Sequence, residues 1–239
     1  MKNIQSLPYS TLNQKGFEVV SIDATNFMKY IPWMTRVYKD VFNASAWKEW
    51  VKCSSGCWFK TTFEDAPQLC PNCSSGIEDF YSDLEIQESV EKVLSKTYFQ
   101  CLLLIQEWDV AWFTWWWKDT LAGIDSEKLW LSESGDIDPT RMKNLIQNLQ
   151  QNNINLSSWE LYYQSETGIS PQYRWKWLGT LLVAVNEEIL RKNSDKVNAI
   201  LQRTSRSSPM YTIRQNLGYN EVFSYDDEDK RVLFARNNY

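Results

Sequence analysis

Histidine is absent from the 239 residues of this chain. Its absence excludes Ser-His-Asp and Cys-His nucleophilic catalysts, histidine-ligated metal sites and an imidazole general base. Glycine and proline are also scarce, with 8 and 7 residues, and the composition excludes a collagen-like, disordered or coiled-coil chain. Any chemistry must therefore use carboxylates, hydroxyls, thiols, backbone dipoles or a bound cofactor.

The sequence also lacks the marks of an exported or membrane-embedded protein. Residues 1–13 contain no charged segment followed by an apolar core, so no secretory signal is predicted. The longest apolar run, Cys101–Ile105, is far too short to span a bilayer. The net charge of −5 argues against a nucleic-acid partner. We therefore expect a cytoplasmic protein with reduced cysteines and no membrane span.

Positive charge is concentrated in one part of this acidic chain. Residues 171–214 contain eight Lys or Arg and three acidic residues, a local net charge of 8 − 3 = +5. Such a field suits an anionic ligand such as a phosphate. A solvated helix face explains the same charges equally well.

Apolar periodicity predicts an α+β fold with one mixed sheet flanked by helices. Strands are expected at 17–22, 98–106, 109–118, 159–169, 197–204, 219–224 and 231–236. Glu107 and Trp108 separate the second and third of these as a hairpin turn. Helices are expected from a cap at Asp23 or Thr25 to about Phe42, and at 82–96, 140–151, 178–189 and 208–217.

Four of the five cysteines form two closely spaced pairs. Cys53 and Cys57 are followed, after twelve residues, by Cys70 and Cys73. In a reduced protein this spacing is typical of a four-thiolate zinc ribbon, and a closed tetrahedral site of this kind is structural. Two disulfides or unliganded thiols are the alternatives. Residues 46–76 are thus predicted to be a zinc-ribbon insertion, and their equal numbers of basic and acidic residues do not favour nucleic acid.

A strand, a proline-containing turn and an amphipathic helix follow one another around residue 170. Backbone N–H groups at a helix N-terminus make such a unit an anion site. The segment resembles the pyrophosphate loop of the GNAT superfamily of acyl-CoA-dependent N-acyltransferases. The match rests on Ile169, Pro171, Tyr173, Arg174, Lys176, Gly179 and Thr180. A second segment, 207–219, resembles the family's Asn-x-Pro-Met-x-x-Ile/Val-Asn-x-x-Leu-Gly-Phe motif.

The resemblance implies a fold, a reaction and a donor site. It implies one GNAT-like acyltransferase domain over 1–239, interrupted by the ribbon at 46–76. The implied reaction is direct transfer, in a ternary complex, of an acyl group from acyl-CoA to an amine of a peptide, protein or small metabolite. A long-chain donor is one form of this hypothesis. The implied acyl-CoA contacts are Ile169, Arg174, Trp175, Lys176, Trp177, Leu178, Gly179, Thr180, Ser207 and Met210.

Three residues depart from the family motifs. Trp177 stands where the family has its first loop glycine, and Ser207 and Arg214 replace two asparagines. A non-glycine residue in the loop restricts φ and crowds the approach of a phosphate. These departures favour an alternative function, in which the chain is a non-catalytic GNAT scaffold whose zinc ribbon docks a partner.

A carboxylate is the expected general base, because the attacking amine must be neutral. Glu166, three residues before Ile169, is the first candidate and Glu160 the second. Each could instead be a solvated strand residue or an ion-pair partner of Arg174; this interpretation is as strong as the base role for Glu166 and stronger than it for Glu160. Some relatives carry a general-acid tyrosine at the position of Arg214, and Tyr211, one helical turn away, is the expected substitute.

The expected oxyanion donor is a backbone N–H of the splayed strand at 166–169, and Gly168 is expected to allow close approach there. Cys101 is interpreted as a core thiol, not a nucleophile.

The strand 110–117 carries five aromatic residues on alternating faces, with Phe113, Trp115 and Trp117 on one of them. A central strand buried on both faces is the favoured interpretation, and an aromatic pocket for an acyl chain or an apolar acceptor is the alternative.

Overall fold

The computed structural model of this chain describes residues 9–43, 48–129, 139–154, 161–174, 178–192, 199–227 and 230–237. The predictions at Glu160, Trp175, Lys176 and Trp177 lie outside these ranges. No helix within them is long and apolar enough to cross a membrane.

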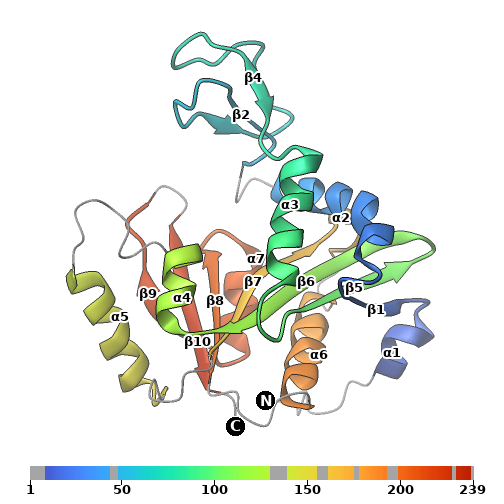
Figure 1. Cartoon of the computed structure of the whole chain (residues 1–239), viewed down its shortest axis with the longest axis vertical. Coiled ribbons are helices and arrows are strands. Elements are labelled where there is room, and N and C mark those ends of the chain that lie inside the picture. The colour runs from blue at the N-terminus through green and yellow to red at the C-terminus, as the bar shows by residue number, and fades with distance from the viewer. Residues whose placement is uncertain are drawn as a thin grey trace.

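A seven-stranded sheet forms the centre of the molecule (Figure 1). Every neighbouring pair is antiparallel except β7 and β8, which are parallel. All seven strands lie where the sequence predicts them. In spatial order they are β1 (Glu18–Ile22), β5 (Gln100–Gln106), β6 (Asp109–Asp119), β7 (Leu161–Ile169), β8 (Ala199–Ser205), β10 (Arg231–Asn237) and β9 (Asn220–Ser224).

The hairpin between β5 and β6 turns on the two residues that the sequence indicates. Glu107 and Trp108 have φ values of 49° and 77°. Positive φ at both central residues is the property of a type I′ turn, whose twist matches that of the flanking strands. The turn joins β5 to β6, the second and third strands of the sheet.

Helices cover both faces of the large sheet. They are α1 (Tyr9–Gln14), α2 (Phe27–Phe42), α3 (Asp83–Leu94), α4 (Leu121–Ile124), α5 (Pro139–Gln151), α6 (Leu178–Lys192) and α7 (Pro209–Asn216). A π-helical turn (Asp125–Leu129) follows α4, and a 3₁₀ turn (Pro171–Tyr173) follows β7. Pro32 lies within α2 without dividing it. Ser82 begins α3 with a reciprocal capping box to Glu85.

Strand β6 is buried on both faces, as the favoured interpretation of its aromatic sequence requires. Phe113, Trp115 and Trp117 belong to one apolar core together with α2 and α3. Trp112 and Trp116 belong to a second core, together with α6, on the opposite face. The alternation of large rings therefore builds two cores from one strand.

The four-cysteine segment forms a separate three-stranded sheet, ordered β3 (Lys60–Thr61), β2 (Val51–Cys53) and β4 (Ile77–Asp79). Figure 1 shows it set off from the large sheet, above α2 and α3. Lys39 of α2 connects the two parts, because its Nζ lies 3.2 Å from Asp79 Oδ2 and 2.9 Å from Asp83 Oδ1. The backbone N–H of Phe63 also donates to Asn43 Oδ1 at 2.9 Å.

The parallel strands β7 and β8 separate partway along their length. Their pairing runs from Leu161 opposite Ala199 to Gln164 opposite Gln202 and goes no further. A bulge lies at the same point, since Trp115 faces Glu166 while Trp116 faces Gln164, which leaves Ser165 as the extra residue of β7. Beyond Gln164, no strand within the described residues pairs with the edge of β7 that faces β8. A gap in the middle of the sheet results.

Candidate functional site

A pocket of about 100 Å³ lies where β7 and β8 separate. Its walls come from six places in the sequence: α2, the entry to the small sheet, the link between β4 and α3, the end of β7, β8 with the start of α7, and the start of β10. Its lining residues are Tyr38, Phe42, Glu49, Tyr81, Ser165, Glu166, Thr167, Gln202, Arg203, Thr204, Ser208, Met210 and Arg231. The pocket thus contains Glu166, the first candidate base, and Met210 from the second motif.

Glu166 lies in this pocket with its side chain 22% exposed. Burial raises the pKa of its carboxyl, and the positive charges of Lys128 and Arg203 oppose that rise. Lys128 Nζ lies 4.0 Å from Glu166 Oε1. The raised pKa lies closer to neutral pH than that of an ordinary glutamate. A general base is most effective when its pKa is close to the pH at which the enzyme works.

Three further residues of the pocket, Tyr38, Tyr81 and Glu49, are not predicted from the sequence. Tyr81 donates its hydroxyl hydrogen bond to Glu49 Oε2 at 2.9 Å, and Lys60 Nζ lies 3.6 Å from Glu49 Oε1. Burial raises the pKa of Tyr38 well above its usual value, and the charge of Glu166 raises it further. Tyr38 shares the apolar periodicity of α2, and Glu49 has no pattern at all, so the sequence gives no signal for either.

Helix α6 is described from Leu178 and follows the 3₁₀ turn after β7 along the chain, as the first motif predicts. Leu178 is buried, and Thr180 is half-buried in the first turn of the helix. A Cβ on Gly179 would lie 2.8 Å from Ile213 Cδ1 and 3.3 Å from Ile169 Cδ1. Gly179 therefore allows α6 to begin close to α7 and to the end of β7.

Arg174 is exposed and turns its guanidinium toward the backbone. Its Nε donates to the Ile169 carbonyl at 3.1 Å, and its Nη2 donates to the Val41 carbonyl at 3.4 Å. Partial burial of the guanidinium lowers the pKa of Arg174, and the negative charge of Asp40 opposes that shift. In this position Arg174 joins the end of β7 to the end of α2.

The second motif forms the turn and helix that the sequence predicts. Ser208 caps α7, and its hydroxyl accepts from the Met210 N–H at 3.3 Å. Gly218 follows the helix with a φ of +81°. Ser207 lies in the turn before the cap, where its hydroxyl is 2.8 Å from that of Ser205.

Tyr211 lies on the other side of this helix and does not line the Glu166 pocket. Its hydroxyl donates to Glu221 Oε2 at 3.2 Å and accepts from Gln215 Nε2 at 3.1 Å. Its ring packs against Phe234, with centroids 5.3 Å apart. A general-acid role for Tyr211 stays a prediction, and these contacts direct the hydroxyl toward β9.

Arg214 is fully buried beneath the point where the strands separate. Its Nη2 donates to Gln164 Oε1, and its Nη1 lies 3.7 Å from Glu187 Oε1. Glu187 also accepts from Tyr219 at 2.7 Å and from Arg236 at 2.8 Å. Arg214 therefore belongs to a buried ionic network. This network is hydrogen-bonded to Gln164, the last residue of β7 that pairs with β8.

Gly168 allows a close approach, but the approaching group is part of the protein. A Cβ at this position would lie 2.6 Å from Val41 Cγ1 and 2.7 Å from Phe113 Cε1. The glycine thus lets α2 pack directly on β7.

Cys101 is fully buried in the core beside α2, and burial raises the pKa of its thiol. Its interpretation as a core thiol is confirmed.

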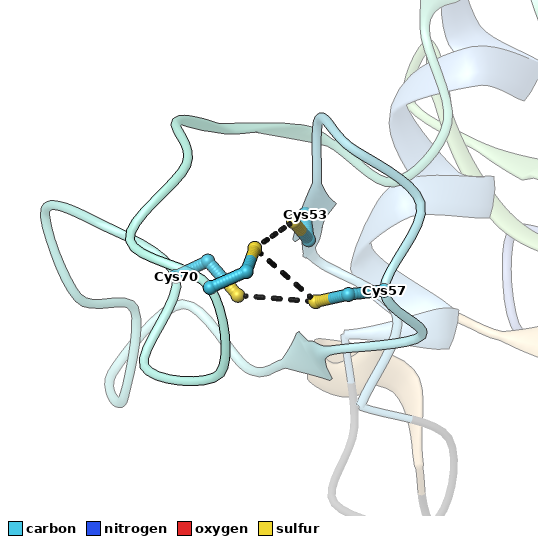
Figure 2. Close-up of side chains that lie close together, drawn as sticks. Cys53, Cys57 and Cys70 are labelled. Atoms are coloured by element: carbon cyan, nitrogen blue, oxygen red, sulfur yellow. Dashed lines mark hydrogen bonds between the residues drawn. The ribbon is translucent and has the colours of Figure 1, made fainter.

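The four paired cysteines converge on one point, and Figure 2 shows Cys53, Cys57 and Cys70 directed toward it. All four sulfur atoms lie within 4.8 Å of one another. Cys53–Cys73 is 3.4 Å, Cys57–Cys70 is 3.3 Å and Cys57–Cys73 is 3.6 Å. Sulfurs bound 2.3 Å from a tetrahedral zinc are about 3.8 Å apart. The donor set therefore fits a four-thiolate metal site, and none of these cysteines forms a disulfide.

Comparisons with solved structures identify chains of the same fold. Apo agmatine N-acetyltransferase, in a mutant form, superposes with a TM-score of 0.51 at 11% identity over 93% of this chain and 100% of that one. An acetyltransferase from Thermus thermophilus gives a TM-score of 0.51 at 8% identity, covering 93% and 97%. The chain has the GNAT fold.

A third structure with this fold holds its ligand. The PaiA N-acetyltransferase from Thermoplasma acidophilum, in complex with coenzyme A, has a TM-score of 0.50 at 9% identity, covering 93% of this chain and 99% of that one. No family model matches the sequence, and no curated protein matches it either. The fold that the resemblance to the GNAT superfamily implies is thus confirmed.

Proposed function

We propose that this protein is an acyl-CoA-dependent N-acyltransferase. The observation that carries this proposal is the separation of β7 from β8 after Gln164 and Gln202, with Glu166 on the free segment. The gap gives a thioester a route between the strands, and it places a carboxylate of raised pKa beside that route. We assign the whole chain to one catalytic domain, with residues 46–76 inserted as a zinc ribbon.

In the proposed reaction, Glu166 removes a proton from the acceptor ammonium, directly or through a water. The neutral nitrogen attacks the thioester carbonyl, a C–N bond forms, and the C–S bond breaks to release CoA thiolate. The nitrogen loses its second proton to give the amide, and the thiolate takes up that proton. Backbone N–H groups along the unpaired edge of β7 hold the oxyanion that develops during attack. No acyl-enzyme is required, which agrees with the absence of histidine and with the burial of Cys101.

Binding of the donor rests on the N-terminus of α6. The helix dipole and the orphan N–H groups of its first turn favour the pyrophosphate, and Thr180 adds a hydroxyl. Ser207 and Met210 stand on the other side of the gap, beside the pantetheine route. Ile169, Arg174, Trp175, Lys176, Trp177, Leu178 and Gly179 complete the donor site that we propose.

We further propose that Cys53, Cys57, Cys70 and Cys73 hold one structural zinc ion. All four sulfur atoms lie within 4.8 Å of one another, and zinc binds cysteine side chains as thiolates. Four thiolates close the coordination sphere, so the ion supplies folding energy to three strands of two or three residues each.

Native mass spectrometry tests the donor site and the metal together. We expect one zinc and, at saturating acyl-CoA, one bound donor. A thiol-release assay with acetyl- to palmitoyl-CoA then identifies the acyl chain that is transferred. Absence of bound CoA under saturating donor, with circular dichroism showing the native fold, would contradict the enzymatic function.

The second candidate function is a binding module on the same scaffold. Trp58, Phe63 and Leu69 of the ribbon are 95%, 62% and 57% exposed, and the guanidinium of Arg174 is occupied by two carbonyls. Under this alternative the chain binds zinc and a partner but no acyl-CoA. The mass spectra therefore separate the two candidates.

A further inference from the structure

A second pocket opens beside the Glu166 pocket, between α2, α3 and the base of the ribbon. Its volume is about 260 Å³. Four aromatic rings line it, from Tyr38, Phe80, Tyr81 and Trp115, together with the aliphatic side chains of Ile86 and Val90. By comparison, an apolar cavity of about 150 Å³ holds a benzene ring. The pocket is therefore large enough for one aromatic ring or a branched alkyl group.

The interior of this pocket is apolar, and the charges at its rim are already paired. Lys52 Nζ lies 3.2 Å from Glu85 Oε1, and Glu85 Oε2 accepts from the backbone N–H of Ser82 at 2.7 Å. Lys52 also lies over the Phe80 ring, 5.7 Å from its centroid. A charged group would displace these pairs, whereas an uncharged apolar group would leave them intact.

The aromatic rings form a rigid wall. Tyr38 is stacked on Trp115, with centroids 5.9 Å apart and planes 7° apart, and it meets Tyr81 edge-on at 5.2 Å. Such contacts fix the shape of the pocket before a ligand arrives, which lowers the entropy lost on binding. Among the large rings of β6, only Trp115 faces this space.

Tyr38 and Tyr81 line both pockets, so the two spaces adjoin. The Glu166 pocket presents two carboxylates to an ammonium group, Glu166 and Glu49, of which Glu49 is also bound by Tyr81 and paired with Lys60. The apolar pocket offers a site for the rest of the same molecule. A single ligand with an amine at one end and a compact apolar group at the other would fill both.

We propose that the acceptor is a primary amine bearing one aryl ring or a branched alkyl group, held against Trp115 while its nitrogen reaches Glu166. This inference rests on the proposed acyl transfer and specifies its acceptor. Trp115, Ile86 and Val90 act as specificity-determining residues, and the base of the ribbon contributes Phe80 to the same wall.

Calorimetric titration of amines into the zinc-loaded protein without acyl donor tests this proposal. The probes are 2-phenylethylamine, its neutral analogue 2-phenylethanol and the compact diamine putrescine. We expect 2-phenylethylamine to bind about tenfold or more tightly than either, because only it satisfies both the carboxylates and the apolar pocket. Equal affinity of the three probes, or no binding of 2-phenylethylamine, overturns the proposal.

A pocket-filling variant locates the binding. Ser89 lines the pocket from an exposed position on α3, so Ser89→Phe fills the space without disturbing the core. We expect it to weaken 2-phenylethylamine by about tenfold or more, whereas Leu84→Phe, at a position of α3 that is 61% exposed and outside the pocket, changes the affinity less than about twofold. Equal affinities in the two variants overturn the proposal.

The donor chain is the other occupant that this pocket could take. If Ser89→Phe weakens octanoyl-CoA but leaves 2-phenylethylamine unchanged, the pocket holds the acyl chain and the proposal is wrong. Because amine binding is measured without donor, a failure of acyl transfer does not alter this result. The two proposals therefore fail independently.

Discussion

Lys128 Nζ lies 4.0 Å from Glu166 Oε1, at the edge of the gap between β7 and β8. The pair places a cation beside a carboxylate whose pKa burial raises. A cation at this distance favours the ionised form of the carboxylate, so it limits the rise in pKa. Two opposing effects thus set the pKa of Glu166. Burial favours the neutral carboxyl, and the charge of Lys128 favours the carboxylate that acts as a base.

Replacing this carboxylate with an amide should remove the base and keep the fold. We expect Glu166→Gln to lower kcat for acyl transfer by about 10²- to 10⁴-fold, the usual contribution of a positioned general base. The affinity for CoA should change little, because the amide has the same shape. Steady-state kinetics and calorimetry measure the two quantities, and Glu88→Gln on the exposed face of α3 is the control. A kcat within threefold of wild type would assign the base elsewhere, with Glu160 the next candidate.

The same variant has a second expected effect, on stability. Because the pKa of Glu166 is raised in the folded protein, the native state binds this proton more tightly than the unfolded state. Stability therefore falls as pH increases from the usual pKa of glutamate to the folded value, and the loss persists at neutral pH. Glu166→Gln should be at least as stable as wild type at pH 7 in urea unfolding. A destabilised variant would contradict this sign.

Changing the neighbouring cation should shift the pH dependence of catalysis. The base works when ionised, so kcat/KM should increase with pH through the pKa of Glu166, which lies above its usual range. Lys128→Met removes an opposing charge and raises that pKa further, so the rising limb moves to higher pH. Lys92→Met, on the surface of α3, is the matched control. An unshifted or lowered limb in Lys128→Met would show that this lysine does not act on the base.

Removal of the metal should affect the ribbon first. Its three strands are too short to fold alone, so a chelator should release one zinc and unfold residues 51–79 while the large sheet persists. Hydrogen exchange by region, with native mass spectrometry for zinc, measures both effects. Cys70→Ser should lose the ion, and Cys101→Ala should retain it, since Cys101 is buried in the main core. Zinc retained in Cys70→Ser would contradict the assigned ligand set.

Packing at Gly168 gives a test that is independent of any ligand. Gly168→Ala places a methyl group 2.6 Å from Val41 Cγ1, and we expect it to cost about 1–3 kcal/mol. Val41→Ala removes the atoms that clash on the α2 side. The double variant should therefore lose less stability than the sum of the single variants. Additive effects in urea unfolding would show that α2 does not pack on β7 in this way.

Much of the fold could be predicted from the sequence because its signals are local. The helices expected at 178–189 and 208–217 and the alternation along β6 each depend on neighbours within one element. The spacing of the two cysteine pairs likewise predicts that the four sulfur atoms come together. These predictions are confirmed as structure, and the bound zinc itself stays a proposal.

The rest of the candidate site could not be predicted, because it depends on distant contacts. Glu49 enters the pocket from the start of the ribbon, and Tyr38 enters it from the middle of a helix whose periodicity shows only a core. Gly168 could be recognised as a point of close approach, but not the group that approaches it. Neither the spacing of residues nor the composition indicates which elements come together at the point where β7 and β8 separate.

Product analysis tests the proposed chemistry most directly. Zinc-loaded protein is incubated with acetyl-CoA and 2-phenylethylamine, and the amide and free CoA are quantified by mass spectrometry for wild type and Glu166→Gln. We predict equal amounts of amide and CoA from wild type, and a rate at least about 10²-fold lower from Glu166→Gln. Failure of the folded wild-type protein to bind acyl-CoA or to form an amide from any amine tested would contradict the proposed acyl transfer.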